Sequence, residues 1–304
     1  MNNNPYQQQV ELLLKVIPYV FKHSFFALKG GTAINLYYRN MPRFSVDIDL
    51  CFLPVVDRKE TYTKIHKALD TIKTDIEKYQ KLKVTLSTPT HQNKETKLTV
   101  YDQNIFIKIE PNYILRGSVY KVSQKELCID AKQQFKLENT IQCLDIADIY
   151  GGKLCAALDR QHPRDLFDIM ILLNNEGITE EIKNSFIYHL LSSNRPIHEL
   201  LEPNEVEIEQ AYLQNFLGMS NTEVSLNELL SIRKKFFALI KNILKDQDKQ
   251  FLLSFVQNQP NWELYAFPKI KEHPSIKWKL LNQSKMNEQK SKNYIKKVKQ
   301  TLNI

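Results

Sequence analysis

The sequence predicts an α+β protein, with a small mixed sheet flanked by helices in the first half and a helical bundle after it. Two stretches, residues 46–53 and 105–110, alternate apolar with polar side chains as half-buried strands do. Apolar residues recur at helical spacing around them, and beyond residue 204 only helical patterns appear. We therefore expect two domains, over residues 1–175 and 176–304.

The front half is predicted to alternate helices with short strands. Helical periodicity is clear over 11–22, where apolar residues recur every three or four positions. Pro42 ends a later helix-compatible stretch, and a polar tripeptide at 102–104 has the spacing of a hairpin turn. In chain order we expect a helix, a strand, a glycine turn, a helix, a strand, a helix and a two-stranded hairpin, over residues 11–22, 25–28, 29–32, 33–38, 46–53, 60–82 and 97–110.

The back half shows helix boundaries that follow known capping rules. Asp145 is the expected N-cap of a helix over 146–158, and Pro163 suits the first position of the next helix, which ends near Asn174. Ser225 and Glu228 predict a capping box for a helix over 226–245. Residues 192–204, with two prolines, are interpreted as a connector.

Composition excludes several classes of protein. The 304 residues are 42% hydrophobic, which is enough for a sizeable core. The most hydrophobic early stretch is interrupted by Lys22 and His23, so no membrane span is expected. The N-terminus does not resemble a secretory signal, and the four cysteines form no CxxC pair. We expect a reduced, cytoplasmic protein without a structural zinc site.

An acidic strand is the first candidate site. Successive side chains of a strand point to opposite faces, so Asp47 and Asp49 share a face, about 7 Å apart. Two such carboxylates can share Mg²⁺, which takes hard oxygen ligands and completes its shell with water and phosphate oxygens. Glu110 on the hairpin offers a third acid, since Phe106, Lys108 and Glu110 face one way and the isoleucines between them the other. The alternative is a solvated strand face.

A glycine pair is the second candidate site. The chain has only seven glycines, and four of them form the pairs Gly30-Gly31 and Gly151-Gly152. Backbone N–H groups at a glycine turn before a helix can bind phosphate oxygens, and Thr32 adds a hydroxyl. An ordinary tight turn is the alternative for Gly30-Gly31. Together with two acids on one strand and a third on a later strand, the turn indicates the plan of the DNA polymerase β-like nucleotidyltransferases.

Four blocks of sequence carry a more specific resemblance. They are KGGTA at 29–33, RFSVDIDL at 43–50, GGKLCAA at 151–157 and RDLFD at 164–168. In this order they resemble the AbiEii/AbiGii toxin family, the nucleotidyltransferase-like toxins of abortive-infection and type IV toxin–antitoxin systems. The resemblance implies a nucleotidyltransferase fold followed by a helical bundle, Mg²⁺ dependence, and either nucleoside triphosphate binding or nucleotide addition to tRNA. Thr32 replaces a common serine, and Val46 a common acid, which leaves the metal ligands intact.

The resemblance also implies roles for single residues. Lys29 and Ser45 join Gly30, Gly31 and Thr32 as nucleotide-binding residues. Lys153 is expected to neutralise triphosphate charge and to act in catalysis, although the sequence alone also allows an exposed helical lysine. Asp165 matches the family's essential aspartate, whereas Asp168, four residues after Arg164, is expected in a structural ion pair. Gly152 and Ala156 leave a strip where another element can approach closely.

The expected function is Mg²⁺-dependent, two-metal nucleotidyl transfer from a nucleoside triphosphate to RNA or tRNA, with a possible cognate antitoxin as partner. Two rivals remain: a glycosyltransferase that uses its two aspartates with a nucleotide sugar, and a catalytically silent nucleic-acid- or partner-binding module. Six lysines lie in the last twenty residues against one acid, Glu288, so RNA is expected to contact Lys285 to Lys299. A frayed, solubilising tail is the alternative. Aromatics and lysines over 262–279 indicate either a base-stacking surface or core packing.

Overall fold

The computed structural model describes residues 4–87 and 95–304. The chain divides into two compact units, the first formed by residues up to Ile149 together with Leu217–Glu223, the second by Tyr150–Phe216 and Val224–Ile304. The predicted domain boundary after residue 175 lies inside the second unit. That boundary stays a prediction.

The first unit contains the sheet. Its helix α1 begins at Pro5, well over one turn before the predicted start at residue 11, because the Asn4 side chain caps it by accepting a hydrogen bond from the Tyr6 N–H. Asp57 caps the long helix α3 in the same way through the Glu60 N–H. In chain order the elements are α1 (Pro5–Val20), β1 (Phe26–Lys29), α2 (Gly30–Ala33), the π-helical η1 (Ile34–Tyr38), β2 (Asp47–Phe52), α3 (Arg58–Gln80), β3 (Lys83–Leu86), β4 (Leu98–Asp102), β5 (Ile105–Asn112), β6 (Ser123–Glu126), α4 (Ile129–Phe135) and β7 (Thr140–Cys143).

The described residues form one seven-stranded mixed sheet in the order β3-β4-β5-β2-β1-β7-β6. β2 runs parallel to β5 and antiparallel to β1, and β1 runs parallel to β7. The mixed α+β fold predicted from the sequence is therefore confirmed. The short strands β3, β6 and β7 were not expected, since four-residue strands near a sheet edge carry little periodic signal.

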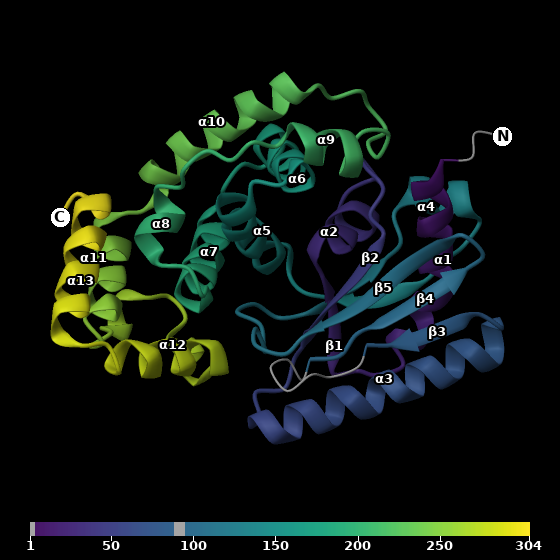
Figure 1. Ribbon diagram of the computed structural model, residues 1–304, viewed down its shortest axis with the longest axis horizontal. Helices are drawn as coiled ribbons and strands as arrows, with labels where there is room; N and C mark the ends of the chain where they lie inside the picture. The colour runs from purple at the N-terminus through teal and green to yellow at the C-terminus, as the bar shows by residue number, and fades with distance from the viewer. Residues whose placement is uncertain (1–3, 88–94) are drawn as a thin grey trace. The chain divides into compact units, whose positions relative to one another are not determined.

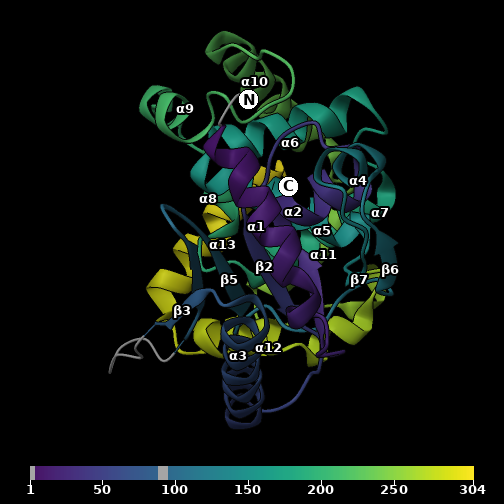
Figure 2. The ribbon, with the colours of Figure 1, turned by 90° about the vertical axis from the view of Figure 1, so that its right-hand side faces the viewer.

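The two faces of the sheet differ in polarity. Ile48 of β2 pairs with Ile109 of β5, and both are fully buried. α1 packs against β2 and β5 on this face and α3 lies beside β3, as Figures 1 and 2 show. The face that carries Asp47 and Asp49 lies on the opposite side of the same strands.

The second unit is helical. Helix α5 (Ile146–Arg160) crosses from the first unit into the second, and the Asp145 carboxylate caps it through the Ala147 N–H, as predicted. The capping box between Ser225 and Glu228 is also confirmed. The remaining elements are α6 (Pro163–Asn174), α7 (Glu180–Ser192), α8 (Ile197–Leu201), α9 (Glu209–Asn215), α10 (Leu226–Ile243), α11 (Asp246–Val256), the 3₁₀ turns η2 (Trp262–Leu264) and η3 (Pro268–Glu272), α12 (Pro274–Ser284) and α13 (Glu288–Leu302).

The predicted connector over 192–204 contains the short helix α8, whose Ile197 and Leu200 are buried. Within the part of the chain that the structure describes, no helix is long and apolar enough to cross a bilayer. All four cysteines are free thiols. Burial raises the pKa of Cys155 to about 12, so this thiol is a packed side chain, as expected.

Candidate active site

The glycine pair opens helix α2 directly at the end of β1. Gly30 has a φ of +72°, a conformation that glycine adopts without a steric penalty. A Cβ atom at Gly30 would lie 2.3 Å from Oδ2 of Asp49, so only glycine lets this carboxylate approach the backbone. The predicted glycine turn is therefore tied to the acidic strand by contact, which the sequence order alone did not show.

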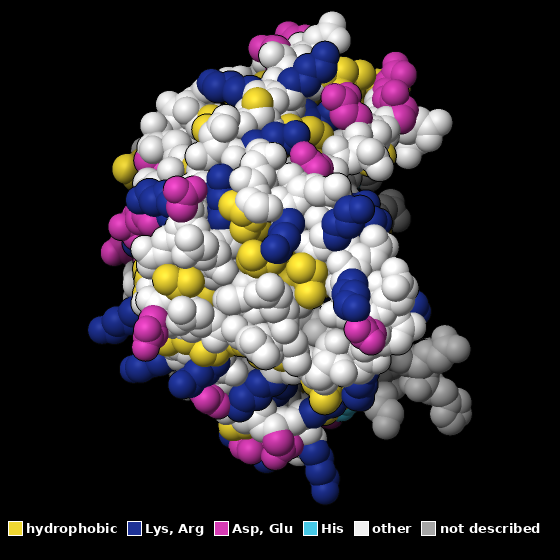
Figure 3. Space-filling view, turned by 90° about the vertical axis from the view of Figure 1, so that its left-hand side faces the viewer, with side chains coloured by type: hydrophobic (Ala, Val, Ile, Leu, Met, Phe, Trp, Pro, Cys, Tyr) yellow, Lys and Arg dark blue, Asp and Glu magenta, His cyan; other side chains and the backbone are white. Residues whose placement is uncertain are grey.

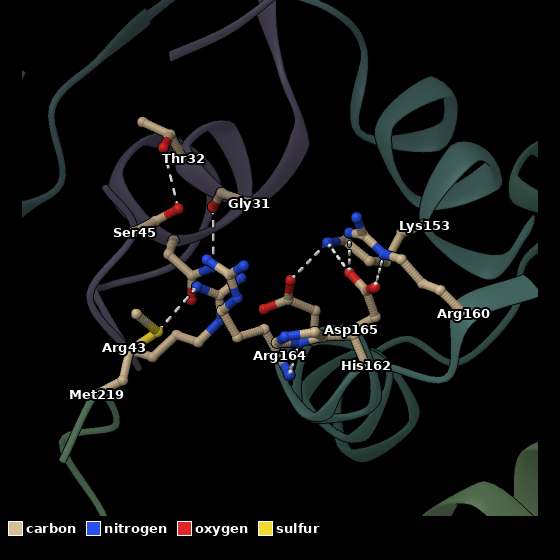
Figure 4. A network of polar contacts seen from close by, with 12 residues as sticks. Gly31, Thr32, Arg43, Ser45, Lys153, Arg160, His162, Arg164, Asp165 and Met219 are labelled. Atoms are coloured by element: carbon tan, nitrogen blue, oxygen red, sulfur yellow. Dashed lines mark hydrogen bonds and ion pairs between the residues drawn. The ribbon is translucent and has the colours of Figure 1, made fainter. Parts of the chain in front are cut away.

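Gly31 is packed against two polar side chains. A Cβ atom there would lie 2.7 Å from Nη2 of Arg43 and 3.0 Å from Oγ of Ser45. The buried Thr32 hydroxyl donates to Oγ of Ser45, at 3.0 Å, and to the backbone oxygen of Asp47. These contacts join α2 to the start of β2 (Figure 4). The Thr32 hydroxyl thus makes internal bonds, and its contact with phosphate stays a prediction.

Arg43 was not among the predicted site residues. It is only 2% exposed, and its Nη1 donates to the backbone oxygen of Phe44 at 2.9 Å and to Sδ of Met219 at 3.9 Å. Residues 217–223 hold this stretch: the Phe44 N–H donates to the Met219 carbonyl at 2.8 Å, and Arg43 forms a β-bridge with Ser220. No local sequence pattern indicates that residues 217–223 contact Arg43, because the two segments are more than 170 positions apart.

Charged side chains line up across three adjacent strands. In the register of the sheet, Lys29 of β1, Asp49 of β2 and Glu110 of β5 are direct neighbours, and Asp47 is beside Lys108. Neighbouring strands are about 4.8 Å apart, so these side chains share one face. The register thus places Asp47, Asp49 and Glu110 on one face of the sheet. The Glu110 carboxylate is ion-paired with Nζ of Lys97 on the far side, at 2.8 Å.

Carboxylate chemistry decides whether this face fits Mg²⁺. The described residues contain no ready-made group of three or more His, Cys, Asp or Glu side chains placed to hold a metal ion. Mg²⁺ in nucleotide sites commonly takes one or two carboxylates and completes its shell with water and phosphate oxygens. The half-buried pair Asp47 and Asp49 fits a metal that arrives with a nucleotide. The metal roles of Asp47, Asp49 and Glu110 stay predictions.

Lys153 is at the centre of a second polar cluster, in the helical unit. Its Nζ is 2.7 Å from Oδ1 of Asp165 and 2.9 Å from Oδ2 of Asp168. Lys153 is 7% exposed, and the two aspartates 1% and 0%. The alternative of an exposed helical lysine is wrong. Asp168 does form the buried ion pair expected of it, and Lys153 is a partner in that pair.

The Asp165 carboxylate has a second cationic partner. Nε of Arg160 is 2.6 Å from Oδ2, and Nη2 is 3.1 Å from Oδ1 (Figure 4). Burial alone would raise the pKa of Asp165, but the Lys153 ammonium and the Arg160 guanidinium outweigh it and hold that pKa well below its usual range. Arg160 was missed by sequence reasoning. Its position at the end of the helix that carries Lys153, five residues before Asp165, was the available signal.

The second glycine pair allows close helix packing, which the sequence predicted at Gly152 and Ala156. A Cβ atom at Gly151 would lie 2.5 Å from Oγ of Ser185 and 2.7 Å from the backbone nitrogen of Phe186, both on α7. At Gly152 it would lie 3.1 Å from the ring of His189. Glycine is needed here because α7 touches the surface of α5. This packing fixes the helix that carries Lys153.

Two predictions about the surface can be compared with the structure, one for the aromatics over 262–279 and one for the C-terminal lysines. Trp262 is half-buried and packs on Phe251 and Phe255, and the buried Tyr265 stacks on Phe251 at 4.8 Å, which agrees with core packing. Trp278 is 52% exposed, so for this residue the base-stacking surface stays a prediction. The frayed-tail alternative is wrong, because residues 288–302 form α13 with Val298 and Leu302 buried.

The mixed sheet and the helices around it resemble those of a solved structure. The structure of MenT4, a nucleotidyltransferase toxin from Mycobacterium tuberculosis H37Rv, superposes with a TM-score of 0.62 at 12% sequence identity, covering 93% of this chain and 95% of that one. This likeness concerns the fold. No curated protein sequence is significantly similar to the chain.

The family itself is shown by sequence. Residues 11–280 match the family described as "Nucleotidyl transferase AbiEii toxin, Type IV TA system". The chain belongs to this family of nucleotidyltransferase toxins, as the four sequence blocks indicated. The glycosyltransferase alternative is thereby disfavoured.

Proposed function

We propose that this protein is a cytoplasmic, Mg²⁺-dependent toxin that transfers a nucleotide from a nucleoside triphosphate to an RNA acceptor, of the tRNA class, and that a cognate antitoxin restrains it. Membership of the AbiEii family supports the reaction type and the antitoxin. The observation that carries the Mg²⁺-dependent reaction is the contact of Asp49 with Gly30, since it joins the acidic pair to the start of α2.

In this proposal Asp47 and Asp49 hold two metal ions, with Glu110 completing the acidic set. Bound Mg²⁺ supplies charge neutralisation and alignment of the triphosphate for in-line displacement. The Gly31 and Thr32 backbone, with Lys29 and Ser45 beside it, cradles phosphate oxygens.

The proposed reaction exchanges the phosphoanhydride bond between the α and β phosphates for a phosphate ester bond to the acceptor. An acceptor hydroxyl forms a bond to the α-phosphorus and releases its proton to solvent, the bond from that phosphorus to the bridging oxygen breaks, and pyrophosphate leaves with that oxygen. Lys153 stabilises the charge on the β and γ phosphates, where most of the negative charge of the leaving group collects. Asp165 supports Lys153 by holding its ammonium group.

Helix α13 supports an RNA acceptor. Lys292, Lys296 and Lys299 line one side of this helix around Ile295, and the only acid in the helix, Glu288, is paired with Lys292 at 2.6 Å. Figure 3 shows the face that carries α13, where dark blue Lys and Arg side chains stand among hydrophobic ones. A basic face beside a polyanion gains affinity from counterion release.

Loss of either aspartate tests the reaction. The wild-type protein is incubated with total RNA, Mg²⁺ and each labelled nucleoside triphosphate, and calorimetry measures triphosphate binding. Asp47→Ala and Asp49→Ala are expected to lower transfer by at least about a hundredfold, since metal-aided charge stabilisation is lost. Their melting temperatures should be unchanged, because removing one of two neighbouring carboxylates relieves repulsion. Asp70→Asn, at an exposed position of α3, is the control.

Normal transfer by both alanine variants would refute the metal assignment. A wild-type protein that binds triphosphates but transfers none of them to RNA would favour the catalytically silent module.

Replacing lysines tests the acceptor surface without removing α13, whose buried side anchors it. Lys292, Lys296 and Lys299 are changed together to glutamine, and Lys59, Lys67 and Lys78 of α3 serve as a control of equal charge. The α13 variant should bind tRNA more weakly and flatten the dependence of log K on log salt by up to about 2, since each phosphate contact contributes roughly 0.7–0.9. Equal salt slopes for the variant and the wild type would place the acceptor elsewhere.

A further inference from the structure

Arg160 is the last residue of α5, and its guanidinium contacts the buried carboxylate of Asp165. Nε and Nη2 donate to the two different oxygens of Asp165, at 2.6 and 3.1 Å, so the contact is bidentate. The Asp165 side chain is 1% exposed, whereas 61% of the Arg160 side chain faces solvent. The guanidinium therefore covers a buried acid from the surface.

A second cation supports the buried Asp165 carboxylate. Lys153 faces two buried carboxylates, Asp165 and Asp168, at 2.7 and 2.9 Å. Buried charges are costly unless they are paired and their hydrogen bonds are satisfied. The guanidinium of Arg160 adds a positive charge beside Asp165 and satisfies both of its oxygens.

We infer that Arg160 is a positioning residue of the active site, which fixes the Asp165 carboxylate and, through it, the direction in which Lys153 presents its ammonium to a bound triphosphate. This inference rests on the proposed function, in which Lys153 meets the β and γ phosphates. Arg160 itself acts from the solvent side of Asp165.

The geometry favours arginine over lysine at this position. A guanidinium donates two parallel hydrogen bonds from a rigid fork and fixes both carboxylate oxygens, whereas an ammonium donates from a single point and leaves the carboxylate free to rotate. With Asp165 rotated, Lys153 would be held chiefly by Asp168. Such a shift of a phosphate-binding group lowers the rate without unfolding the chain.

A purely structural role is the competing explanation, since Arg160 also ends helix α5. The two roles differ in their pH dependence. The charged groups that face Asp165 are Lys153 and Arg160 from α5 and Asp168 from α6, and His162 caps α6 beside it. Without Arg160, one of the two cations that lower the pKa of Asp165 is lost while burial still raises it, so the carboxylate is protonated at a higher pH than in the wild type and then ceases to hold Lys153.

The test compares Arg160→Gln and Arg160→Lys with Arg195→Gln. Arg195 is a matched control, because it lies in the same unit and is also a partly exposed arginine that forms an ion pair. Its Nη1 is 2.7 Å from Oδ1 of Asp159, the residue before Arg160, and its side chain is 37% exposed. For each protein we measure nucleotide transfer to total RNA in the presence of Mg²⁺, from pH 5 to 9. The measurement gives kcat and the KM for each nucleoside triphosphate. Calorimetry gives the affinities for ATP and AMP, and thermal melting gives stability.

Arg160→Gln is expected to lower kcat/KM by about tenfold or more, as removal of a supporting side chain commonly does. It should weaken ATP binding more than AMP binding and move the acid side of the pH profile to higher pH. Arg160→Lys should restore part of the rate, and Arg195→Gln should behave as wild type.

Two outcomes overturn the inference alone: Arg160→Gln with wild-type kinetics and pH profile, or a loss of rate that follows only a lowered melting temperature and that Arg160→Lys does not relieve. A wild-type protein that neither binds nor transfers any of the four triphosphates instead refutes the proposed function, and the inference with it.

Discussion

The two charged clusters of this protein differ in how their charges are accommodated. Asp47 and Asp49 are half-buried on one face of the sheet, whereas Lys153, Asp165 and Asp168 are enclosed and paired with one another. A half-buried carboxylate keeps much of its hydration and can exchange water for a cation. An enclosed ion pair has lost its water and depends on its partners. Substitutions should therefore affect ligand binding in the first cluster and stability as well in the second.

The largest effect is expected from breaking the enclosed cluster. Lys153→Met leaves two buried carboxylates without their shared ammonium and should lower the free energy of unfolding by about 3–5 kcal/mol. Urea denaturation at pH 7 measures it. The double variant Lys153→Met with Asp168→Asn should recover part of this loss without recovering activity. If Lys153→Met leaves stability unchanged, the cluster is not enclosed in solution.

The next effect tests the contact between Gly30 and Asp49. Gly30→Ala must place a Cβ where the Asp49 carboxylate lies and should weaken Mg²⁺–ATP binding by about tenfold or more, since displaced ligands lose much of their effect. Gly177→Ala is the control, because Gly177 has a similar φ of +69° and open space around it. Both variants carry about 1–2 kcal/mol of backbone strain. Equal nucleotide affinities in the two variants would show that the contact is unimportant.

A smaller effect concerns pH and Asp165. Its pKa is lowered in the folded protein, so its ion pairs stabilise the fold above the pKa of an unfolded aspartate, about 3.9, and this stability is lost as pH falls. The difference in free energy of unfolding between wild type and Arg160→Gln should thus be constant near neutral pH and narrow in acid. Denaturation at pH 7, 5 and 3 measures it. A difference in free energy of unfolding that becomes larger in acid would contradict the assignment of a lowered pKa to Asp165.

The smallest effect is expected at the edge of the acidic face. Lys97→Gln removes an exposed partner of Glu110 and should change stability by less than about 1 kcal/mol. If Glu110 completes the metal site, its release should raise Mg²⁺ affinity several-fold at most, as measured by calorimetric titration of Mg²⁺ with ATP present. Weaker binding would instead show that Lys97 contacts the nucleotide.

The sequence by itself determined the local elements and the identity of the family. Strand alternation placed Asp47 and Asp49 on one face, and capping residues such as Asp145 and Ser225 marked helix starts, because both signals act within a few residues of chain. The four motif blocks identified the AbiEii family, which the match over residues 11–280 confirms.

Only the tertiary structure decided which partners these residues have. The strand register placed Glu110 beside Asp49, and the Glu110 carboxylate forms an ion pair with Lys97. Packing of the helices enclosed Lys153 with two aspartates, one of which also contacts Arg160. Residues 217–223 returned to hold Arg43 from more than 170 positions away. Periodicity and capping depend on residues that are close in sequence. Pairing and burial depend on segments that meet only after folding.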